Sequence, residues 1–237
     1  MTDHLEQFIA SIDQCVDKKY HGTSYTESYV AFLDILGMKE LTNRPYQELR
    51  NVFNALESGR KLYSKVHTPQ GSFISPEMLN VTIMSDAVVM SIDARQSNAF
   101  AMLVGFTSNM ISKLLHKTEP TVFLRGGITK GDIFHRGDQV FGPGLVKAYT
   151  LENAHAKSMR CIVAWDLINN DHDVKRYIEN NSSLKKDPED RYYFIDFATE
   201  QLRPKLVKSA QRMTESDCPQ TVKDKYLWLE RYLNDWK

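Results

Sequence analysis

The feature that most constrains this 237-residue chain is an apolar stretch, residues 29–37, that carries one acid and ends in glycine. Its aliphatic and aromatic side chains predict a buried β-strand. Because an unpaired carboxylate is costly to bury, Asp34 within this strand indicates a metal ligand. Gly37 then allows a tight turn whose amides can face an anion. The alternative is that Asp34 lies at an exposed strand end and caps the next helix.

A second acid lies in a predicted β-hairpin. Two β-rich runs, residues 79–84 and 87–92, flank Ser85 and Asp86, whose residue types favour turns. Asp86 is an ordinary turn residue in one interpretation. In the other, the strands are apolar on both sides and lie inside the sheet, so Asp86 shares a sheet end with Asp34. Two carboxylates beside a glycine turn suit Mg²⁺ or Mn²⁺ with a triphosphate, because these cations prefer oxygen ligands.

Four motifs follow one another in an order that resembles the class III nucleotidyl cyclase homology domain. They are Phe-Leu-Asp-Ile-Leu-Gly at 32–37, Ser-Asp at 85–86, Leu-Arg-Gly-Gly-Ile-Thr-Lys-Gly at 124–131, and Phe-Gly leading to Ala-Tyr-Thr-Leu-Glu at 141–152. No single motif is specific, whereas the ordered set is. Within the family, the set most resembles the pyrimidine nucleotide cyclases of the bacterial Pycsar anti-phage system. The resemblance covers about residues 25–165, the greater part of the chain.

The resemblance implies a reaction and its cofactors. A cyclase drives the ribose 3′-OH at the α-phosphorus of a nucleoside triphosphate while diphosphate leaves, and two cations can clamp the attacking and leaving oxygens. The resemblance puts Asp34 and Asp86 on both of two divalent cations, Mn²⁺ or Mg²⁺, with the backbone carbonyl of Ile35 on one of them. It favours UTP over CTP as substrate.

The resemblance also implies the phosphate contacts. The amides of Leu36, Gly37 and Met38 would face the β- and γ-phosphates. Arg125 matches the arginine that binds the leaving phosphates. Arg160 matches a basic residue that reaches the triphosphate from the other subunit, and both arginines would stabilise charge that grows in the transition state.

Some positions depart from the purine cyclases of this family. Those enzymes carry an acid where Pro143 stands, and an asparagine and an arginine where Val146 and Thr150 stand. Loss of the acid removes the usual purine contact and favours a pyrimidine base. A purine cyclase with unusual contacts and a catalytically silent nucleotide-binding dimer module remain the alternatives. Lys147 and Tyr149 are candidate substitutes for the missing helix contacts.

Two further residues are candidate substrate contacts. Phe32 would line the base pocket, with core packing as its alternative role. Lys130 would contact a phosphate, with an exposed strand face as its alternative.

Composition limits the partners. The 30 basic and 30 acidic side chains cancel, which argues against a protein that mainly coats nucleic acid or binds acidic membranes. No apolar run suits a membrane span or a signal peptide, and the three cysteines are odd in number and far apart, so we expect a cytoplasmic protein without disulfides. The resemblance adds a homodimer with two equivalent sites at its interface and a downstream effector that senses the cyclic nucleotide.

The order of predicted elements indicates an α+β fold. Strand, helix, hairpin, helix, hairpin, helix and strand predict a ferredoxin-like cyclase palm, an antiparallel-rich sheet with helices packed on one face. We expect an N-terminal helical segment at 1–24, the cyclase domain at 25–165 and an extension packed on it at 166–237. In this extension, residues 169–190 predict a short helix and a solvated loop, and residues 191–197 predict a last strand at the sheet edge.

Overall fold

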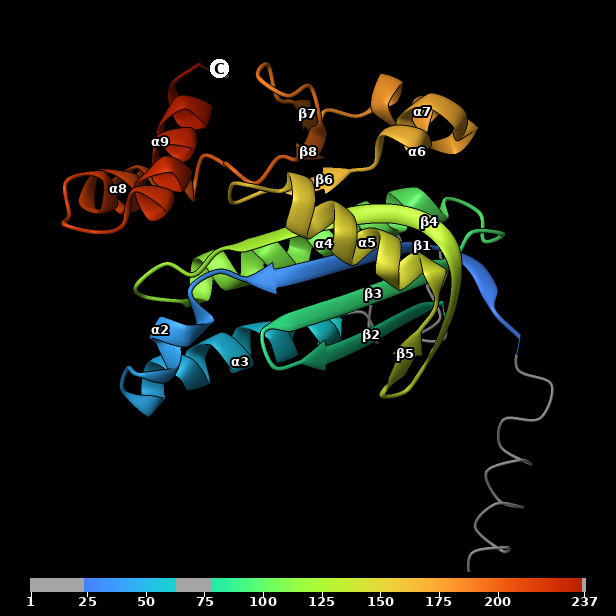
Figure 1. Cartoon of the computed structure of the whole chain (residues 1–237), viewed down its shortest axis with the longest axis horizontal. Coiled ribbons are helices and arrows are strands. Elements are labelled where there is room, and N and C mark those ends of the chain that lie inside the picture. Colours follow the sequence, from blue (N-terminus) through green and yellow to red (C-terminus); the bar gives the residue numbers. More distant parts are fainter. Residues whose placement is uncertain (1–23, 63–77, 236–237) are drawn as a thin grey trace, which may run out of the picture.

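One mixed sheet organises the chain in the computed structural model, which describes residues 24–62 and 78–235 (Figure 1). The strand order is β2-β3-β1-β4-β6-β8-β7, with β5 paired to β4 off this path. Every pairing is antiparallel except that of β4 with β6. The strands are β1 (Thr26–Ile35), β2 (Leu79–Met84), β3 (Ala87–Asp93), β4 (Leu124–Arg136), β5 (Gln139–Phe141), β6 (Cys161–Val163), β7 (Leu184–Lys186) and β8 (Tyr193–Ile195).

The helices of the described residues pack on this sheet and on one another. They are α2 (Met38–Thr42), α3 (Tyr46–Leu62), α4 (Ala99–Lys117), α5 (Pro143–His155), α6 (Trp165–Asn170), α7 (His172–Asn180), α8 (Arg203–Thr214) and α9 (Gln220–Asp235). The predicted α+β fold with an antiparallel-rich sheet and packed helices is therefore confirmed. The predicted N-terminal helical segment lies outside the described residues.

Helices cover both faces of the sheet, so the prediction of helices on one face is wrong. Alternate side chains of a strand point to opposite faces. Tyr29 of β1 meets Phe100 of α4, with ring centroids 5.5 Å apart. The next residues along, Val30 and Phe32, belong to a separate apolar cluster with Ala148 of α5. In Figure 1, α5 crosses the near side of the sheet and α4 lies behind it.

Glycines in β4 allow α5 to lie directly on the strand. A Cβ atom on Gly127 would stand 2.8 Å from the carbonyl oxygen of Ala148, and one on Gly131 would stand 3.1 Å from the Cα of Gly144. Any side chain at these positions would push the helix away. The glycines of the third motif therefore bring α5 close to the strand that carries Arg125.

The C-terminal part of the chain extends the same sheet. β8 pairs with β6 on one side and with β7 on the other, so it is not the edge strand that the sequence predicted. β7 lies in a segment that we had predicted as loop. The hairpin prediction for residues 79–92 is confirmed, although β2 lies at the edge and only β3 lies inside the sheet. Helices α8 and α9 pack together near the C-terminal end (Figure 1).

Candidate functional site

An arginine shared by two acids marks the end of the central strands. Asp34 of β1 and Arg125 of β4 are direct partners in the antiparallel register, so their side chains leave the same face of the sheet. Arg125 Nε donates to Asp34 Oδ2 at 3.0 Å. The same Nε lies 2.5 Å from Oε1 of Glu152 on α5. We call Asp34, Arg125 and Glu152 the Arg125 cluster.

Burial makes this cluster electrostatically costly. The side chain of Glu152 is only 2% exposed, whereas those of Asp34 and Arg125 are each 23% exposed. Burial raises the pKa of the Asp34 carboxyl, and the bond from Arg125 offsets this only in part. Burial likewise raises the pKa of Glu152 despite the attraction of Arg125. One guanidinium thus contacts two carboxylates, and the pKa values of both remain raised by burial.

Asp86 lies beside this cluster. It occupies the turn between β2 and β3, where Ser85 takes a left-handed conformation with φ of 54°. The amide of Ile35 donates to the main-chain oxygen of Asp86 at 2.8 Å, which ties the turn to the end of β1. The negative charge of Asp86 also contributes to the raised pKa of Asp34. Asp86 is therefore a turn residue and a neighbour of Asp34 at once.

The helix-capping alternative for Asp34 is wrong. The N-cap of α2 is Gly37, in a left-handed conformation with φ of 78°, and no side chain caps that helix. The Asp34 carboxylate points instead to Arg125. Asp34 is therefore a partly exposed acid at a strand end, paired with an arginine of the neighbouring strand.

The donors at this strand end fit an oxygen-preferring divalent cation. Among residues 24–62 and 78–235, no three His, Cys, Asp or Glu side chains gather as a ready-made metal cluster. Asp34 and Asp86 supply two carboxylates, and Ile35 supplies a main-chain carbonyl beside them. Mg²⁺ characteristically uses one or two carboxylates and completes its shell with water and substrate phosphates, so these groups are the candidates to hold such a cation.

The glycine turn after β1 offers fewer amides than predicted. The amide of Leu36 donates to the carbonyl oxygen of Phe123 at 2.9 Å, so a phosphate contact there requires that bond to break. Gly37 and Met38 begin α2, where the first N–H groups of a helix have no partner inside it. They remain the amides suited to the predicted contact.

Arg160 lies in a different environment from the one predicted. Its guanidinium is 4% exposed and forms close ion pairs with Asp187 and Asp190. It also lies over the ring of Trp228 at 5.6 Å, and the indole Nε1 of Trp228 donates to Asp187 at 2.9 Å. We call Arg160, Asp187, Asp190 and Trp228 the Arg160 cluster. A contact from Arg160 to a triphosphate would require these ion pairs to open.

The two predicted lysine contacts lie apart from Asp34. Lys130 is paired with Tyr29 in the register, five residues from Asp34 along β1 and hence on the opposite face. Its Nζ donates to Asp171 at 3.0 Å, and Tyr29 donates to the same carboxylate at 2.9 Å. Although burial acts to raise it, these two bonds hold the pKa of Asp171 below its ordinary value. Lys147 is exposed on α5.

Phe32 and Tyr149 do come together on the face of Asp34. Their rings meet edge to face, with centroids 5.4 Å apart. Phe32 is partly buried among the residues under α5, whereas Tyr149 is 50% exposed. Val146 of α5 is also exposed, at 62%. Exposed Phe141 pairs instead with Phe134 at the far end of β4, on the opposite face of the sheet. The apolar surface on the face of Asp34 is therefore made by Phe32, Tyr149 and Val146.

Two residues near the site were missed by the sequence interpretation. Glu152 ends the last motif, where a charged helix residue is ordinarily exposed. Lys225 of α9 lies close enough to Asp34, Arg125 and Glu152 to interact with their charges, and burial followed by the repulsion of Arg125 lowers its pKa. No local pattern in the C-terminal segment links Lys225 to Asp34, so only the tertiary fold reveals it.

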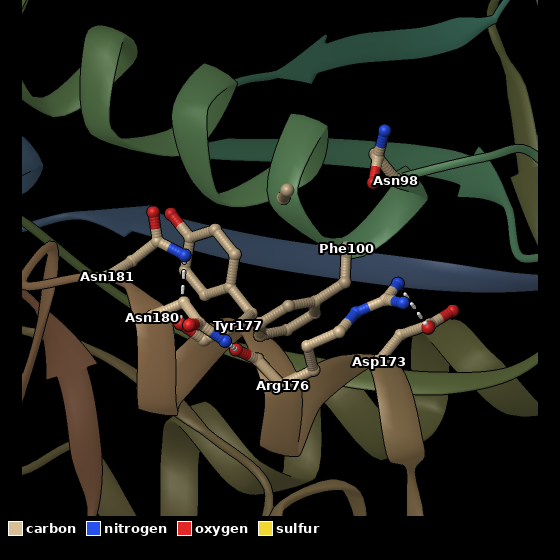
Figure 2. Close-up of a pocket in the computed structure, with 8 residues that line it drawn as sticks. Asn98, Phe100, Asp173, Arg176, Tyr177, Asn180 and Asn181 are labelled. Carbon is tan, nitrogen blue, oxygen red and sulfur yellow. Dashed lines mark hydrogen bonds and ion pairs between the residues drawn. The ribbon is translucent and has the colours of Figure 1, made fainter.

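A separate hollow lies between α7 and the start of α4 (Figure 2). It encloses about 360 Å³ and is lined by residues that include Asn98, Phe100 and Tyr177. Its arginine, Arg176, is paired with Asp173 at 2.9 Å. None of the predicted site residues lines it, so we do not assign it to the same function.

Comparison with known proteins adds a distant structural likeness. No family model and no curated protein matches the chain. A solved structure described as an adenylate/guanylate cyclase/hydrolase from Silicibacter pomeroyi aligns over 74% of this chain and 100% of its own, with 14% identity and a TM-score of 0.46. We therefore base the functional argument on the residues of this chain. Among the described helices, none is both long enough and apolar enough to cross a membrane.

Proposed function

We propose that this protein is a nucleotide cyclase that converts UTP, or alternatively CTP, to the 3′,5′-cyclic nucleotide and diphosphate. The observation that carries the proposal is the meeting of Asp34, Arg125 and the Asp86 turn at one end of the central strands. These are the acids and the arginine that the ordered cyclase motifs require. Asp34, Asp86 and Arg125 come from three different motifs. The glycine turn at Gly37 follows the strand that carries Asp34.

The roles of the residues follow from their chemistry. Asp34, Asp86 and the carbonyl of Ile35 would hold two divalent cations, Mn²⁺ or Mg²⁺, which supply charge neutralisation at the attacking and leaving oxygens when bound. Arg125 presents a planar, permanently charged group to the diphosphate as it departs. Glu152 is buried against Arg125 and restricts the orientation of that guanidinium. The amides of Gly37 and Met38 contact the outer phosphates.

The base contacts support a pyrimidine. Pro143, at the start of α5, offers no acid to read a purine edge, and Phe32 with Tyr149 offers aromatic surface on the same face as Asp34. The preference for UTP over CTP rests on the resemblance to the pyrimidine cyclases of anti-phage systems. In that setting the product is a cytoplasmic alarm read by a separate effector.

We further propose that the active form is a homodimer with two equivalent sites at the interface. Exposed Val146 and Tyr149 lie on α5, where a second copy would bury them. Lys147 is an exposed lysine of the same helix and would contact the partner's site. A predominantly monomeric protein in sedimentation measurements would contradict this arrangement.

One observation favours the alternative of a catalytically silent nucleotide-binding module. Arg160 is held by two carboxylates, and Val146 and Thr150 replace the helix contacts of purine cyclases. A silent module would bind triphosphate without turning it over. Product formation distinguishes it from both the pyrimidine and the purine cyclase.

The test is an incubation of the full chain with ATP, GTP, UTP and CTP in the presence of Mn²⁺, followed by chromatographic and mass analysis. Cyclic UMP or cyclic CMP supports the proposal and identifies the base. Cyclic AMP or cyclic GMP supports the purine cyclase and rejects the proposed specificity. Bound but unchanged triphosphate supports the silent module.

A further inference from the structure

A second cavity lies beside the glycine turn, between α2 and the C-terminal helices. It encloses about 400 Å³, within the range of small-molecule sites. Its walls come from the start of α2, the segment before β4, and helices α8 and α9. The acids and the arginine of the proposed nucleotide site do not line it, whereas Leu36 and Gly37 do, so the cavity adjoins that site and shares its glycine turn.

The interior wall of this cavity is apolar. Leu41, Val122, Phe123 and Met159 are each at most 5% exposed and form its floor. Tyr226 of α9 extends this wall, with its ring edge-on to Phe123 at 5.9 Å between centroids. Such a surface can bury the apolar part of a ligand but offers no hydrogen-bonding group to it.

The rim is strongly cationic. Arg44, Arg212 and Lys225 line the cavity against a single acid, Glu40. The side chains of Arg212 and Lys225 form no hydrogen bond or ion pair with any residue that the structure describes, whereas Arg44 has an exposed contact of 3.4 Å with Glu48. Lys225 lies close enough to Asp34, Glu40 and Glu152 to interact with their charges. Arg212 is therefore the rim cation that has no acidic partner among the described residues.

The hydroxyl of Tyr226 adds a hydrogen-bond donor at the same place. It lies close enough to the guanidinium groups of Arg212 and Arg44 to interact with their charges. It makes no hydrogen bond with residues 24–62 or 78–235. The guanidinium of Arg212 and the hydroxyl of Tyr226 lack an acidic partner among the described residues, and together they match a single anionic head group.

We propose that this cavity binds a small amphipathic anion, with its head group beside Arg212 and Tyr226 and its apolar body against the buried floor. The ligand class is an aromatic or aliphatic body with one carboxylate, sulfonate or phosphate. The hollow of Figure 2 lacks this chemistry because its arginine is already paired with Asp173. The two cavities are similar in volume, about 400 and 360 Å³, so charge and not size separates them.

The probe is 8-anilino-1-naphthalenesulfonate, which joins an aromatic body to one sulfonate and fluoresces when its surroundings are apolar. We expect saturable binding to the full chain in a fluorescence titration. Arg212 is exposed, so Arg212→Gln leaves the fold unchanged, and we expect it to weaken binding by about tenfold or more, the effect of one charge-assisted hydrogen bond. Arg176→Gln, in the hollow of Figure 2, is the matched control and leaves the affinity unchanged.

Two further measurements locate the probe and test its charge. With methionine methyl groups labelled by ¹³C, the probe shifts the resonances of Met159 and Met213, which line the cavity. N-phenyl-1-naphthylamine, which has the same aromatic body without the sulfonate, binds at least about tenfold more weakly.

Three outcomes overturn the proposal. The first is equal affinity in the wild type and Arg212→Gln, and the second is equal affinity for the uncharged probe. The third is competitive displacement by UTP with Mn²⁺, which assigns the cavity to the nucleotide site instead. None of these readouts requires turnover, so failure of the cyclase proposal leaves this test intact.

Discussion

Two arginines on neighbouring strands have opposite environments. Arg125 and Arg160 each precede a residue of the parallel pair Gly126 and Cys161, and each contacts two acids. The side chain of Arg125 is 23% exposed, and that of Arg160 is 4% exposed. Arg160 has both carboxylates and an indole around it, whereas a single nitrogen of Arg125 contacts both of its acids.

The difference separates an ion-pair cluster that joins segments of the fold from the cluster that we propose as part of the active site. The Arg160 cluster joins the start of β6 to the segment after β7 and to α9, and so fixes the C-terminal extension to the sheet. The Arg125 cluster keeps a partly exposed acid beside Asp86, with raised carboxyl pKa values that show incomplete compensation. In the proposed function, Asp34 together with Asp86 would hold an added cation.

The largest effect is expected from Arg160→Met. The substitution leaves Asp187, whose side chain is 2% exposed, without its main counter-charge, and we expect a loss of about 3–5 kcal/mol in the free energy of unfolding. Urea denaturation followed by circular dichroism measures this loss. A loss below about 1 kcal/mol would remove the structural role of the cluster.

Arg125→Met tests the other half of the comparison. We expect it to lower the rate of cyclic nucleotide formation by about 10²–10³-fold, because a cation at the departing phosphates is lost. Its effect on unfolding is smaller than that of Arg160→Met, because Asp34 is accessible to water and because the buried Glu152, whose pKa is already raised by burial, can take up a proton when the guanidinium is lost. Equal destabilisation by the two substitutions would contradict the distinction between the clusters.

Trp228→Phe tests a single hydrogen bond within the Arg160 cluster. It keeps the aromatic packing on Tyr232 and Phe194 but removes the indole N–H that donates to Asp187. We expect a loss of about 1–2 kcal/mol in the free energy of unfolding, with little change in activity. Thermal unfolding and the product assay, run on the same sample, check both parts.

His135 is a buried titratable group without a charged partner, in contrast to both arginine clusters. Its expected contribution to the free energy of unfolding is the smallest of those considered. Its ring nitrogens contact the hydroxyls of Thr82 at 2.9 Å and Ser91 at 2.8 Å, and burial lowers its pKa to about 4. Because the unfolded chain binds this proton near pH 6.5 and the folded chain does not, stability is present above that pH and lost as the pH falls toward 4.

Between pH 7.5 and pH 6 we expect His135 to account for a loss of about 0.7 kcal/mol in the free energy of unfolding. His135→Gln, measured by denaturation across this range, should remove that part of the slope. An unchanged slope would assign the acid sensitivity to other groups.

The sequence predicted the local parts of the site and failed on the long-range ones. Asp34, Asp86 and Gly37 carry recognisable strand and turn patterns, and the β1–β4 register brings the acid to Arg125 as the motifs implied. The partners of Arg160 lie in a segment of high polarity that we had predicted as solvated loop. β7, only three residues long with two lysines, has no periodicity to reveal it.

The placement of α5 could not be derived from periodicity either. Its residues show no clear apolar stripe, and the close approach depends on Gly127 and Gly131 of another element. For the same reason, Lys225 and the cavity beside α9 depend on tertiary packing that no local pattern encodes. The residues at the ends of β1 and of the β2–β3 hairpin could be predicted from the sequence. The C-terminal residues that pack around them could not.

The most direct test of the account compares the wild type with Asp34→Asn in Mn²⁺-dependent release of diphosphate from UTP and CTP. We predict equimolar diphosphate and cyclic nucleotide from the wild type, and none above background from Asp34→Asn. Because Asp34 is partly exposed and the oxygen of an asparagine amide can still accept the bond from Arg125 Nε, the variant should remain folded at pH 7. Equal product from the two proteins, or no cyclic product from the wild type, would contradict the assignment of this strand end as a cyclase site.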